Sequence, residues 1–270
     1  MKLTIVDVFA EAPYQGNQLA VVEDAASLPA TTMQDIAREM NFSETTFVLS
    51  QTGQRAEVRI FTPGEELPFA GHPTLGTAWV LSGGRGTITL ALAGGDVPVR
   101  FDAGVGWLTP PPAVEGDSLA PAQAARLVGL PEADLDAEFD PQVVRCGPTF
   151  LIVPLRSLDA LKRMRVDLDV QRELGIPGFP FTFCRGGYSA DADFAARMQF
   201  FDGTGVREDP ATGSANAALA TYLRRRGITG ARVVEQGFEI RRPSRIYLDI
   251  GEILAVGGRV QPVAEGRLYR

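Results

Sequence analysis

The chain has 270 residues, of which 45% are hydrophobic and 22% are charged, and its formal net charge is −7. This composition is typical of a soluble globular protein, and the length favours two domains over one. The negative charge argues against nucleic acid and against an anionic membrane surface as partners. A site for an anionic ligand must therefore be built locally.

Few residues of this chain could bind a metal or form disulfides. Cys146 and Cys184 are the only cysteines and His72 is the only histidine. These numbers are too small for a disulfide framework and argue against a His/Cys metal site. Residues 3–9 alternate like a strand and not like a signal peptide, and no apolar run reaches transmembrane length. We therefore expect a cytoplasmic protein without a bound metal.

The first part of the chain predicts mainly strands. One helix is indicated over 29–40, where Met33, Ile36, Ala37 and Met40 recur at helical spacing. A second helix follows the turn at 62–64 and stops at Gly83-Gly84. The predicted strands are 3–9, 19–22, 42–49, 56–61, 86–93 and 96–101.

The middle of the chain predicts a linker. The proline run of 107–112, followed by Gly116-Asp117-Ser118, indicates a boundary between domains 1–115 and 116–270. The last strand, about 257–270, could pack back on the first domain. Beyond the boundary we predict helices at 121–128 and 158–164, and strands at 148–154, 179–184, 194–201, 232–235, 237–240, 245–250, 252–256 and 259–263. Strands outnumber helices, which predicts an α+β fold of two pseudo-symmetric β-rich domains, each wrapped around a central helix.

Two helix motifs support this duplication. Residues 66–81 align without a gap with residues 208–223, at an offset of 142 residues. An offset of about half the chain is expected for a duplicated domain. In this alignment Glu66 matches Glu208, Pro68 matches Pro210, Gly71 matches Gly213, and His72 takes the place of Ser214.

Each motif predicts a helix start suited to an anion. Thr212-Gly213-Ser214 lies at the junction of turn and helix, with Ser214 as the expected N-cap and Pro73 expected at the first helical position of the other motif. Exposed N–H groups and the helix dipole at Gly71 and Gly213 would favour a carboxylate or phosphate. Asp209 beside them could act as an acid or base. Nucleotide motifs of the Gly-x-Gly-x-x-Gly or P-loop kind are missing, so no nucleotide site of these kinds is expected.

These motifs carry a family resemblance. The chain resembles the PhzF-like (phenazine biosynthesis-like) family of the diaminopimelate epimerase-like fold. The matching segments are Val6-Asp7-Val8-Phe9 with Gly16-Asn17, Phe42-Ser43-Glu44-Thr45-Thr46-Phe47, Phe61-Thr62-Pro63 through Gly76, and Glu208 through Ala217, with weaker support from Gln236-Gly237 and Arg242-Pro243-Ser244. Two departures are Gln18, where a proline is usual, and Arg241, where a glycine is usual.

The resemblance implies two similar domains with the active site between them, and a cofactor-free isomerisation by proton transfer. In the best-known member a dihydro-hydroxyanthranilate is isomerised towards phenazine formation. The residue matching Glu44 is there the central acid/base, while those matching His72, Asp209 and Ser214 support it and bind substrate. The resemblance also implies a small-molecule carboxylate substrate and a homodimer.

Each candidate residue has a plainer explanation. Glu44 could be a solvated strand-start residue, His72 a helix cap, Asp209 a turn residue and Asn17 part of a Gly-Asn turn. We nevertheless expect Glu44, His72 and Asp209 to be catalytic. Substrate binding is expected from Gly71, Thr212, Gly213, Ser214 and Asn17. Because a raised pKa suits a general acid/base, Glu44 is expected to be partly buried.

The cysteines argue against one reaction of this fold. Its racemases resemble one another in placing a cysteine at each helix motif, whereas this chain has Ala70 and Pro210-Ala211 there. Cys146 and Cys184 lie outside both motifs, so we expect them to be buried packing residues. Three hypotheses follow: an isomerase moving a proton within a small carboxylate-bearing substrate, for which a cyclic amino-acid-like compound is one candidate; a non-catalytic ligand-binding or protein-interaction member of the fold; and an epimerase that uses carboxylates.

Overall fold

The computed structural model describes residues 1–201 and 205–269. The chain forms two compact units, of which the first comprises residues 1–109 and 256–270 and the second residues 110–255. Residues 110–115, expected in the first domain, belong to the second unit, because β9 (Val114–Ser118) pairs with β10 (Gln142–Arg145). Within the described part of the chain, no helix is both long and apolar enough to cross a membrane.

The first unit is a mixed sheet that surrounds a helix. Hydrogen bonding follows the order β18-β1-β2-β3-β4-β6-β7-β8-β17, with β5 added along the end of β4. The pairs β2–β3 and β4–β6 are parallel and the others antiparallel. The strands are β1 (Lys2–Val8), β2 (Asn17–Val22), β3 (Glu44–Thr52), β4 (Arg55–Phe61), β5 (Glu66–Leu67), β6 (Thr87–Leu92), β7 (Gly95–Asp102), β8 (Val105–Leu108), β17 (Leu254–Gly258) and β18 (Val260–Arg267).

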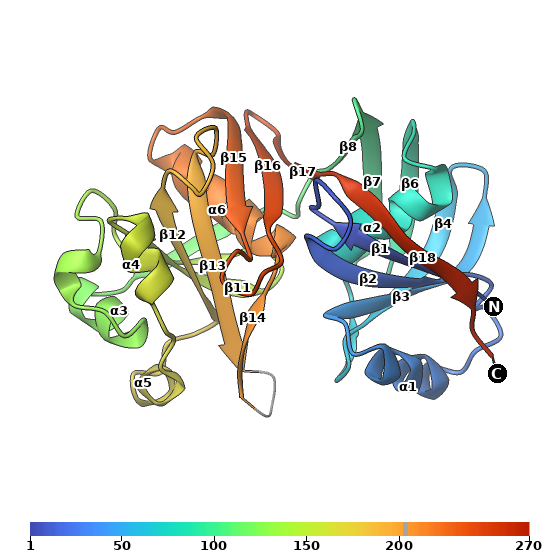
Figure 1. The fold of residues 1–270 in the computed structure, drawn as a ribbon, viewed down its shortest axis with the longest axis horizontal. Helices are drawn as coiled ribbons and strands as arrows, with labels where there is room; N and C mark the ends of the chain where they lie inside the picture. The colour runs from blue at the N-terminus through green and yellow to red at the C-terminus, as the bar shows by residue number, and fades with distance from the viewer. Residues whose placement is uncertain (202–204, 270) are drawn as a thin grey trace. The chain divides into compact units, whose positions relative to one another are not determined.

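The central helix of this unit is α2 (Gly71–Ser82), which contacts strands on all sides: β1, β2, β3, β6, β7, β8 and β18 (Figure 1). Its residues 71–78 are all buried, which agrees with a helix that is apolar and small around its whole circumference. The second helix, α1 (Ala30–Met40), lies on β3 and β4 and buries Met33 and Ala37 against Phe47 and Phe61.

The second unit repeats this plan. Its strands pair in the order β9-β10-β11-β12-β13, after which β13 pairs with β15 through its beginning and with β14 through its end; β15 then pairs with β16. The remaining elements are α3 (Pro121–Leu127), η1 (Glu132–Asp134), β11 (Thr149–Leu155), α4 (Leu158–Arg163), α5 (Leu168–Glu173), β12 (Phe179–Arg185), β13 (Phe194–Phe201), β14 (Val206–Asp209), α6 (Gly213–Arg225), β15 (Gly230–Gln236) and β16 (Ser244–Ile250). The helix α6 packs on β10, β11 and β16 (Figure 1).

The two units match element by element. The series β3-β4-β5-α2-β6-β7 corresponds to β12-β13-β14-α6-β15-β16, with the same sequence of parallel and antiparallel pairs. In each series one strand pairs both with the short strand before the central helix and with the strand after it, and we call it the shared strand. It is β4, which pairs with β5 and β6, in the first unit, and β13, which pairs with β14 and β15, in the second. The pseudo-symmetric α+β fold expected from the helix motifs is therefore confirmed.

An ion pair recurs at the same place in both units. The guanidinium Nε and Nη2 of Arg59 donate to the two carboxylate oxygens of Glu66, at 2.7 and 2.6 Å. The same two atoms of Arg197 donate to Glu208, at 3.0 and 2.6 Å. Both pairs join the shared strand to the short strand that leads into the central helix. The duplicated motif thus includes the glutamate together with the arginine that holds it.

A close backbone approach also recurs after the central helix. A Cβ on Gly94 would come within 2.9 Å of the Pro68 carbonyl oxygen, and a Cβ on Gly237 within 2.6 Å of the Pro210 carbonyl oxygen. Only glycine fits where the chain passes this near the proline of each motif.

Local expectations were corrected in four places. The helix α6 begins at Gly213 with Thr212 as its N-cap, so Ser214 is its second residue and not the cap. Pro73 is the third residue of α2, still in the first turn, where its missing N–H costs no helical bond. Residues 237–240 form a turn and not a strand. Residues 116–118, expected in a linker, lie in β9.

Candidate active site

Three predicted residues come together in the first unit. Asn17 begins β2 and Glu44 begins β3, and these neighbouring parallel strands place Leu19 opposite Glu44. His72 is the second residue of α2, which packs against both strands. Because the starts of parallel strands meet at one edge of a sheet, the two strand beginnings and the helix start meet there.

The contacts of these residues centre on the imidazole ring. The Nδ1 atom of His72 lies 3.3 Å from Oε2 of Glu44 and 3.5 Å from Nδ2 of Asn17. The Nε2 atom lies 3.3 Å from the backbone oxygen of Gln18. The side chain of His72 is 5% exposed and that of Glu44 is 15% exposed, so Glu44 is partly buried as expected.

Burial fixes the state of the ring. Desolvation lowers the pKa of His72 to about 3, against a smaller raising effect of the hydrogen bond to Gln18, so the ring is neutral at pH 7. A carbonyl oxygen only accepts hydrogen bonds, so Nε2 carries the ring proton and Nδ1 is an acceptor. The amide of Asn17 can donate to Nδ1. The carboxyl group of Glu44 can donate to it whenever that group carries a proton.

The second unit holds the other predicted polar residues. Asp209 ends β14 and is buried, Thr212 caps α6, and Gly213 and Ser214 are the first two helical residues. The hydroxyl of Thr212 donates to Oδ2 of Asp209 at 2.6 Å. Asp209, the turn and the start of α6 are therefore joined by a hydrogen bond, as the predicted junction suggested. The side chain of the N-cap Thr212 bonds to Asp209 and not to an N–H group of the helix.

The two helix starts share one property. Neither α2, capped by Ala70, nor α6, capped by Thr212, has a side chain that caps its first turn. The first N–H groups of a helix have no partner within the helix, and the dipole makes that end positive. Gly71 and Gly213 are buried, while Ser214 is half-buried. Both ends therefore present donors that suit a carboxylate.

Two contributors were not predicted. The backbone oxygen of Gln18 sets the tautomer of His72, although Gln18 was noted only as a departure from the family pattern. Gln236 makes four hydrogen bonds around Thr212, yet it was noted only as part of a weakly matching segment. The role of Gln18 depends on its backbone oxygen, and a backbone contact cannot be seen in the pattern of side chains. Gln236 could have been found, because an isolated glutamine followed by a glycine at the end of a strand is visible in the sequence.

Thiol and metal chemistry find little support here. Cys146 and Cys184 are both buried, and burial raises the pKa of their thiols to about 11 and about 12. Both are therefore packing residues, as expected, and not the thiolates that a two-cysteine racemase needs. The residues that the structure describes contain no group of three or more His, Cys, Asp or Glu side chains placed to hold a metal ion.

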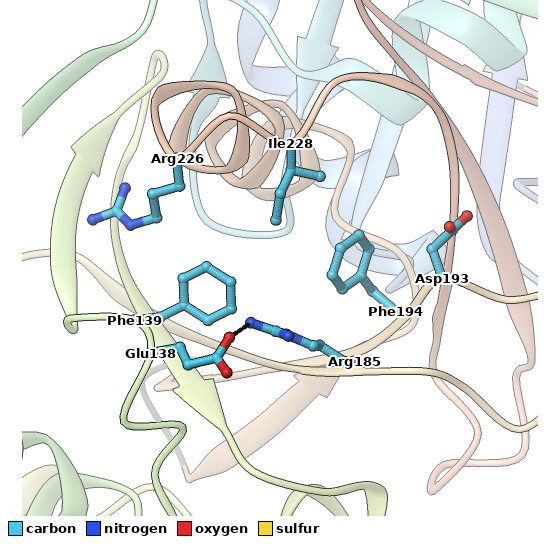
Figure 2. Close-up of a pocket in the computed structure, with 7 residues that line it drawn as sticks. All are labelled: Glu138, Phe139, Arg185, Asp193, Phe194, Arg226 and Ile228. Carbon is cyan, nitrogen blue, oxygen red and sulfur yellow. Dashed lines mark hydrogen bonds and ion pairs between the residues drawn. The ribbon is translucent and has the colours of Figure 1, made fainter.

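A separate open pocket lies at the far end of α6. Figure 2 shows Phe139 and Phe194 lining it, together with Arg185, which donates a hydrogen bond to Glu138; Asp193, Arg226 and Ile228 complete the lining. Arg226 caps the end of α6, and the helix has 13 residues. At about 1.5 Å of rise per residue, this end lies about 20 Å from Gly213. The pocket contains none of the predicted site residues.

Known proteins are similar to nearly the whole chain. Residues 6–265 match the model of the PhzC-PhzF family, described as phenazine biosynthesis-like protein. The chain belongs to this family. A trans-2,3-dihydro-3-hydroxyanthranilate isomerase of Pseudomonas aeruginosa is 38% identical over 99% of both chains. One of Pseudomonas fluorescens is 39% identical over 90% of this chain and 88% of that protein.

Solved structures agree on the fold. A PhzF-family phenazine biosynthesis protein of Bacillus anthracis superposes with a TM-score of 0.88 at 26% identity, covering 100% of this chain and 99% of the other. A predicted epimerase of Pseudomonas aeruginosa gives 0.83 at 33% identity with the same coverage. A probable proline racemase from Agrobacterium radiobacter, at 0.62 and 13% identity over 99% of this chain and 92% of the other, shares the fold alone. The chain is thus an isomerase of the PhzF family that acts on a small substrate.

Proposed function

We propose that this isomerase moves a proton within a small carboxylate-bearing substrate without a cofactor, and that Glu44 is the acid/base. The observation that carries the proposal is the 3.3 Å contact between Oε2 of Glu44 and Nδ1 of His72 in a largely buried setting. A carboxyl group held beside a neutral acceptor is equipped to take a proton from carbon and to return it.

The reaction balances without any added reagent. Glu44 takes a proton from one carbon, so one C–H bond breaks and the electron pair shifts the double bond. A proton returned to a second carbon forms a new C–H bond, and no electrons enter or leave. While Glu44 carries the proton, its carboxyl group can donate to Nδ1 of His72, and this hydrogen bond stabilises the intermediate state.

The second unit carries the other residues that we propose for substrate binding. We propose that Asp209 contacts a polar group of a substrate molecule. Each helix start, at Gly71 in the first unit and at Gly213-Ser214 in the second, is proposed as a place that suits a carboxylate. Support comes from the absence of capping side chains at both starts and from the burial of Asp209. Asn17 would hold the ring of His72 in place, and with it the Nδ1 atom that accepts from Glu44.

The names of two relatives support a substrate for the proposal. Two proteins that are 38% and 39% identical to this chain are named trans-2,3-dihydro-3-hydroxyanthranilate isomerases. We therefore propose trans-2,3-dihydro-3-hydroxyanthranilate, a cyclic amino acid, or a close analogue as the first compound to test.

The experiment is turnover of this compound by the wild-type protein and by Glu44→Gln. The amide keeps the shape of the side chain but cannot take a proton, so turnover should fall by about a thousandfold or more while binding changes little. Glu57→Gln, which alters an exposed residue of β4, is the matched control and should keep full activity. Full turnover by Glu44→Gln would remove Glu44 from the mechanism.

Absorbance and optical rotation of the product separate the two reaction types. In D2O a double-bond shift gives a product whose absorbance has changed, while epimerisation gives a product of unchanged absorbance and altered optical rotation. The Pseudomonas aeruginosa protein at 33% identity is named a predicted epimerase, so the second outcome is worth measuring. Deuterium on carbon that is lost with Glu44→Gln supports the proposed acid/base in either case.

A further inference from the structure

The buried side chain of Gln236 holds the turn between β14 and α6 through four hydrogen bonds. Its Oε1 accepts from the backbone N of Thr212 at 3.2 Å and from Nδ2 of Asn216 at 3.1 Å. Its Nε2 donates to the backbone oxygen of Asp209 at 3.0 Å and to Oγ1 of Thr212 at 3.0 Å. The residue is fully buried.

The orientation of this amide has one consistent solution. The backbone N of Thr212 can only donate, so it requires the oxygen of Gln236, and the backbone oxygen of Asp209 can only accept, so it requires the nitrogen. Asn216 agrees, because its Nδ2 also donates to the backbone oxygen of Thr212 at 2.9 Å. A reversed Gln236 amide would set donor against donor and acceptor against acceptor.

This orientation decides the direction of the next bond. The Nε2 group of Gln236 has no lone pair to offer, so Oγ1 of Thr212 accepts from it. The hydroxyl proton of Thr212 is then directed to Oδ2 of Asp209, 2.6 Å away. Gln236 thus orients the Thr212 hydroxyl as a donor to the carboxylate.

The matching position in the first unit carries no amide. The repeated ion pair matches Arg59 with Arg197, so Glu57, two residues earlier, matches Ala195. Glu57 pairs with Ala91 of β6, and Ala195 pairs with Glu235 of β15, so Ala91 matches Glu235. The next residues are Leu92 and Gln236, while the residues before the matched glycines Gly94 and Gly237 are Ala93 and Gln236; neither Leu92 nor Ala93 has an amide side chain. Of the matching positions, only the one in the unit that carries Asp209 has an amide side chain. This difference indicates that Gln236 has a role in positioning the Asp209 carboxylate, in addition to supporting the fold.

We propose that Gln236 is a positioning residue of the active site, which acts through the Thr212 hydroxyl to hold the Asp209 carboxylate in its working orientation. The inference rests on the proposed function, in which Asp209 contacts substrate. Gln236 itself touches no reacting atom in this scheme.

The test is a double-mutant cycle on turnover of trans-2,3-dihydro-3-hydroxyanthranilate. Gln236→Met keeps the length of the side chain and removes all four bonds, while Thr212→Val removes only the hydroxyl. Each should lower kcat about ten- to a hundredfold with KM changed less than about threefold, because a hydrogen bond to a charged group is lost. The double variant Gln236→Met/Thr212→Val should have a kcat no more than about twofold below that of Thr212→Val, because Gln236 acts through that hydroxyl. Thr212→Ser restores the hydroxyl and should keep kcat within about twofold.

Other outcomes are distinguishable. If the two kcat losses multiply, or if Gln236→Met retains full kcat, Gln236 does not act through Thr212 and the inference fails. If Asp209→Asn retains full turnover, the assignment of Asp209 in the proposed function fails instead. Should the wild-type protein not turn over this compound, crystal structures still decide: Oδ2 of Asp209 should leave Oγ1 of residue 212 in Gln236→Met and stay bonded in Thr212→Ser. An unmoved carboxylate in Gln236→Met would overturn the inference.

Discussion

The Nδ1 atom of His72 lies 3.3 Å from Oε2 of Glu44, and the ring can meet that oxygen only as an acceptor. The backbone oxygen of Gln18 accepts a hydrogen bond from the one protonated ring nitrogen, Nε2. Burial disfavours a second proton on the ring. A contact that would look like a salt bridge on a protein surface therefore involves a neutral ring, and it becomes a hydrogen bond when the carboxyl group of Glu44 carries a proton. This distinction determines two of the predictions that follow.

The tautomer of His72 can be observed directly. Since the chain contains one histidine, protein labelled with 15N-histidine gives a single imidazole spectrum. We expect protonated Nε2 and unprotonated Nδ1 from pH 8 down to pH 5, because the pKa of the ring is about 3. Glu44→Gln should leave the Nε2 proton in place. A ring that becomes doubly protonated near pH 6.5 would contradict the neutral state of His72.

The buried ring should also make stability depend on pH. The pKa of His72 is about 3 in the folded state and about 6.5 in the unfolded state, so below pH 6.5 the unfolded chain binds more protons. Its contribution is complete above pH 6.5 and is lost as the pH falls, by about 1.4 kcal/mol per unit. From pH 7.5 to pH 5 the free energy of unfolding should fall by about 2 kcal/mol through this group.

The control for this measurement removes the two side chains in turn. Denaturant unfolding of Glu44→Gln should retain the pH-dependent loss, since the histidine is still present. The double variant Glu44→Gln/His72→Asn should lack it, although its stability is lower throughout. Parallel stability curves for the two variants would show that the ring titrates normally in the folded protein.

The repeated ion pair offers an internal comparison of burial. Arg197 and Glu208 are 3% and 5% exposed, whereas Arg59 and Glu66 are 28% and 35% exposed. Glu208→Gln removes the bidentate partner of a buried guanidinium, which keeps only a 3.6 Å contact between its Nε and Glu239, and should lower the free energy of unfolding by about 3 kcal/mol. Glu66→Gln should cost about 1 kcal/mol or less. Equal losses in chemical denaturation would mean that burial does not set the value of this pair.

Arg241 is a position where stability can be gained. It is exposed and has a φ of +60°, a left-handed conformation that costs a residue with a Cβ about 1–2 kcal/mol. Arg241→Gly removes this strain but adds freedom to the unfolded chain, so we expect a net gain of about 0.5–1 kcal/mol. Arg241→Ala keeps the Cβ and should gain nothing. Equal stability of the two variants would show that the side chain, and not the backbone, sets the energy here.

Much of the fold could be predicted because its signals are local. The two helix motifs, their gapless match and the glycines at Gly71 and Gly213 are properties of short stretches, and the helices begin at those glycines. Where local signals compete, the prediction was wrong. Ser214 was expected to cap α6 because serine favours that position, but Thr212 lies there, with its hydroxyl directed to Asp209.

The residue types of the site were visible in the chain, but their chemical states were not. A single histidine, an acidic strand start and an Asp-Pro turn before a helix are enough to nominate His72, Glu44 and Asp209. That the imidazole is neutral depends on its burial between α2 and the strands, and its tautomer depends on a backbone oxygen 54 residues away. Gln236 reaches Asp209 across 27 residues in the same way. Desolvation and hydrogen-bond direction arise from neighbours in space, so tertiary structure alone could assign them.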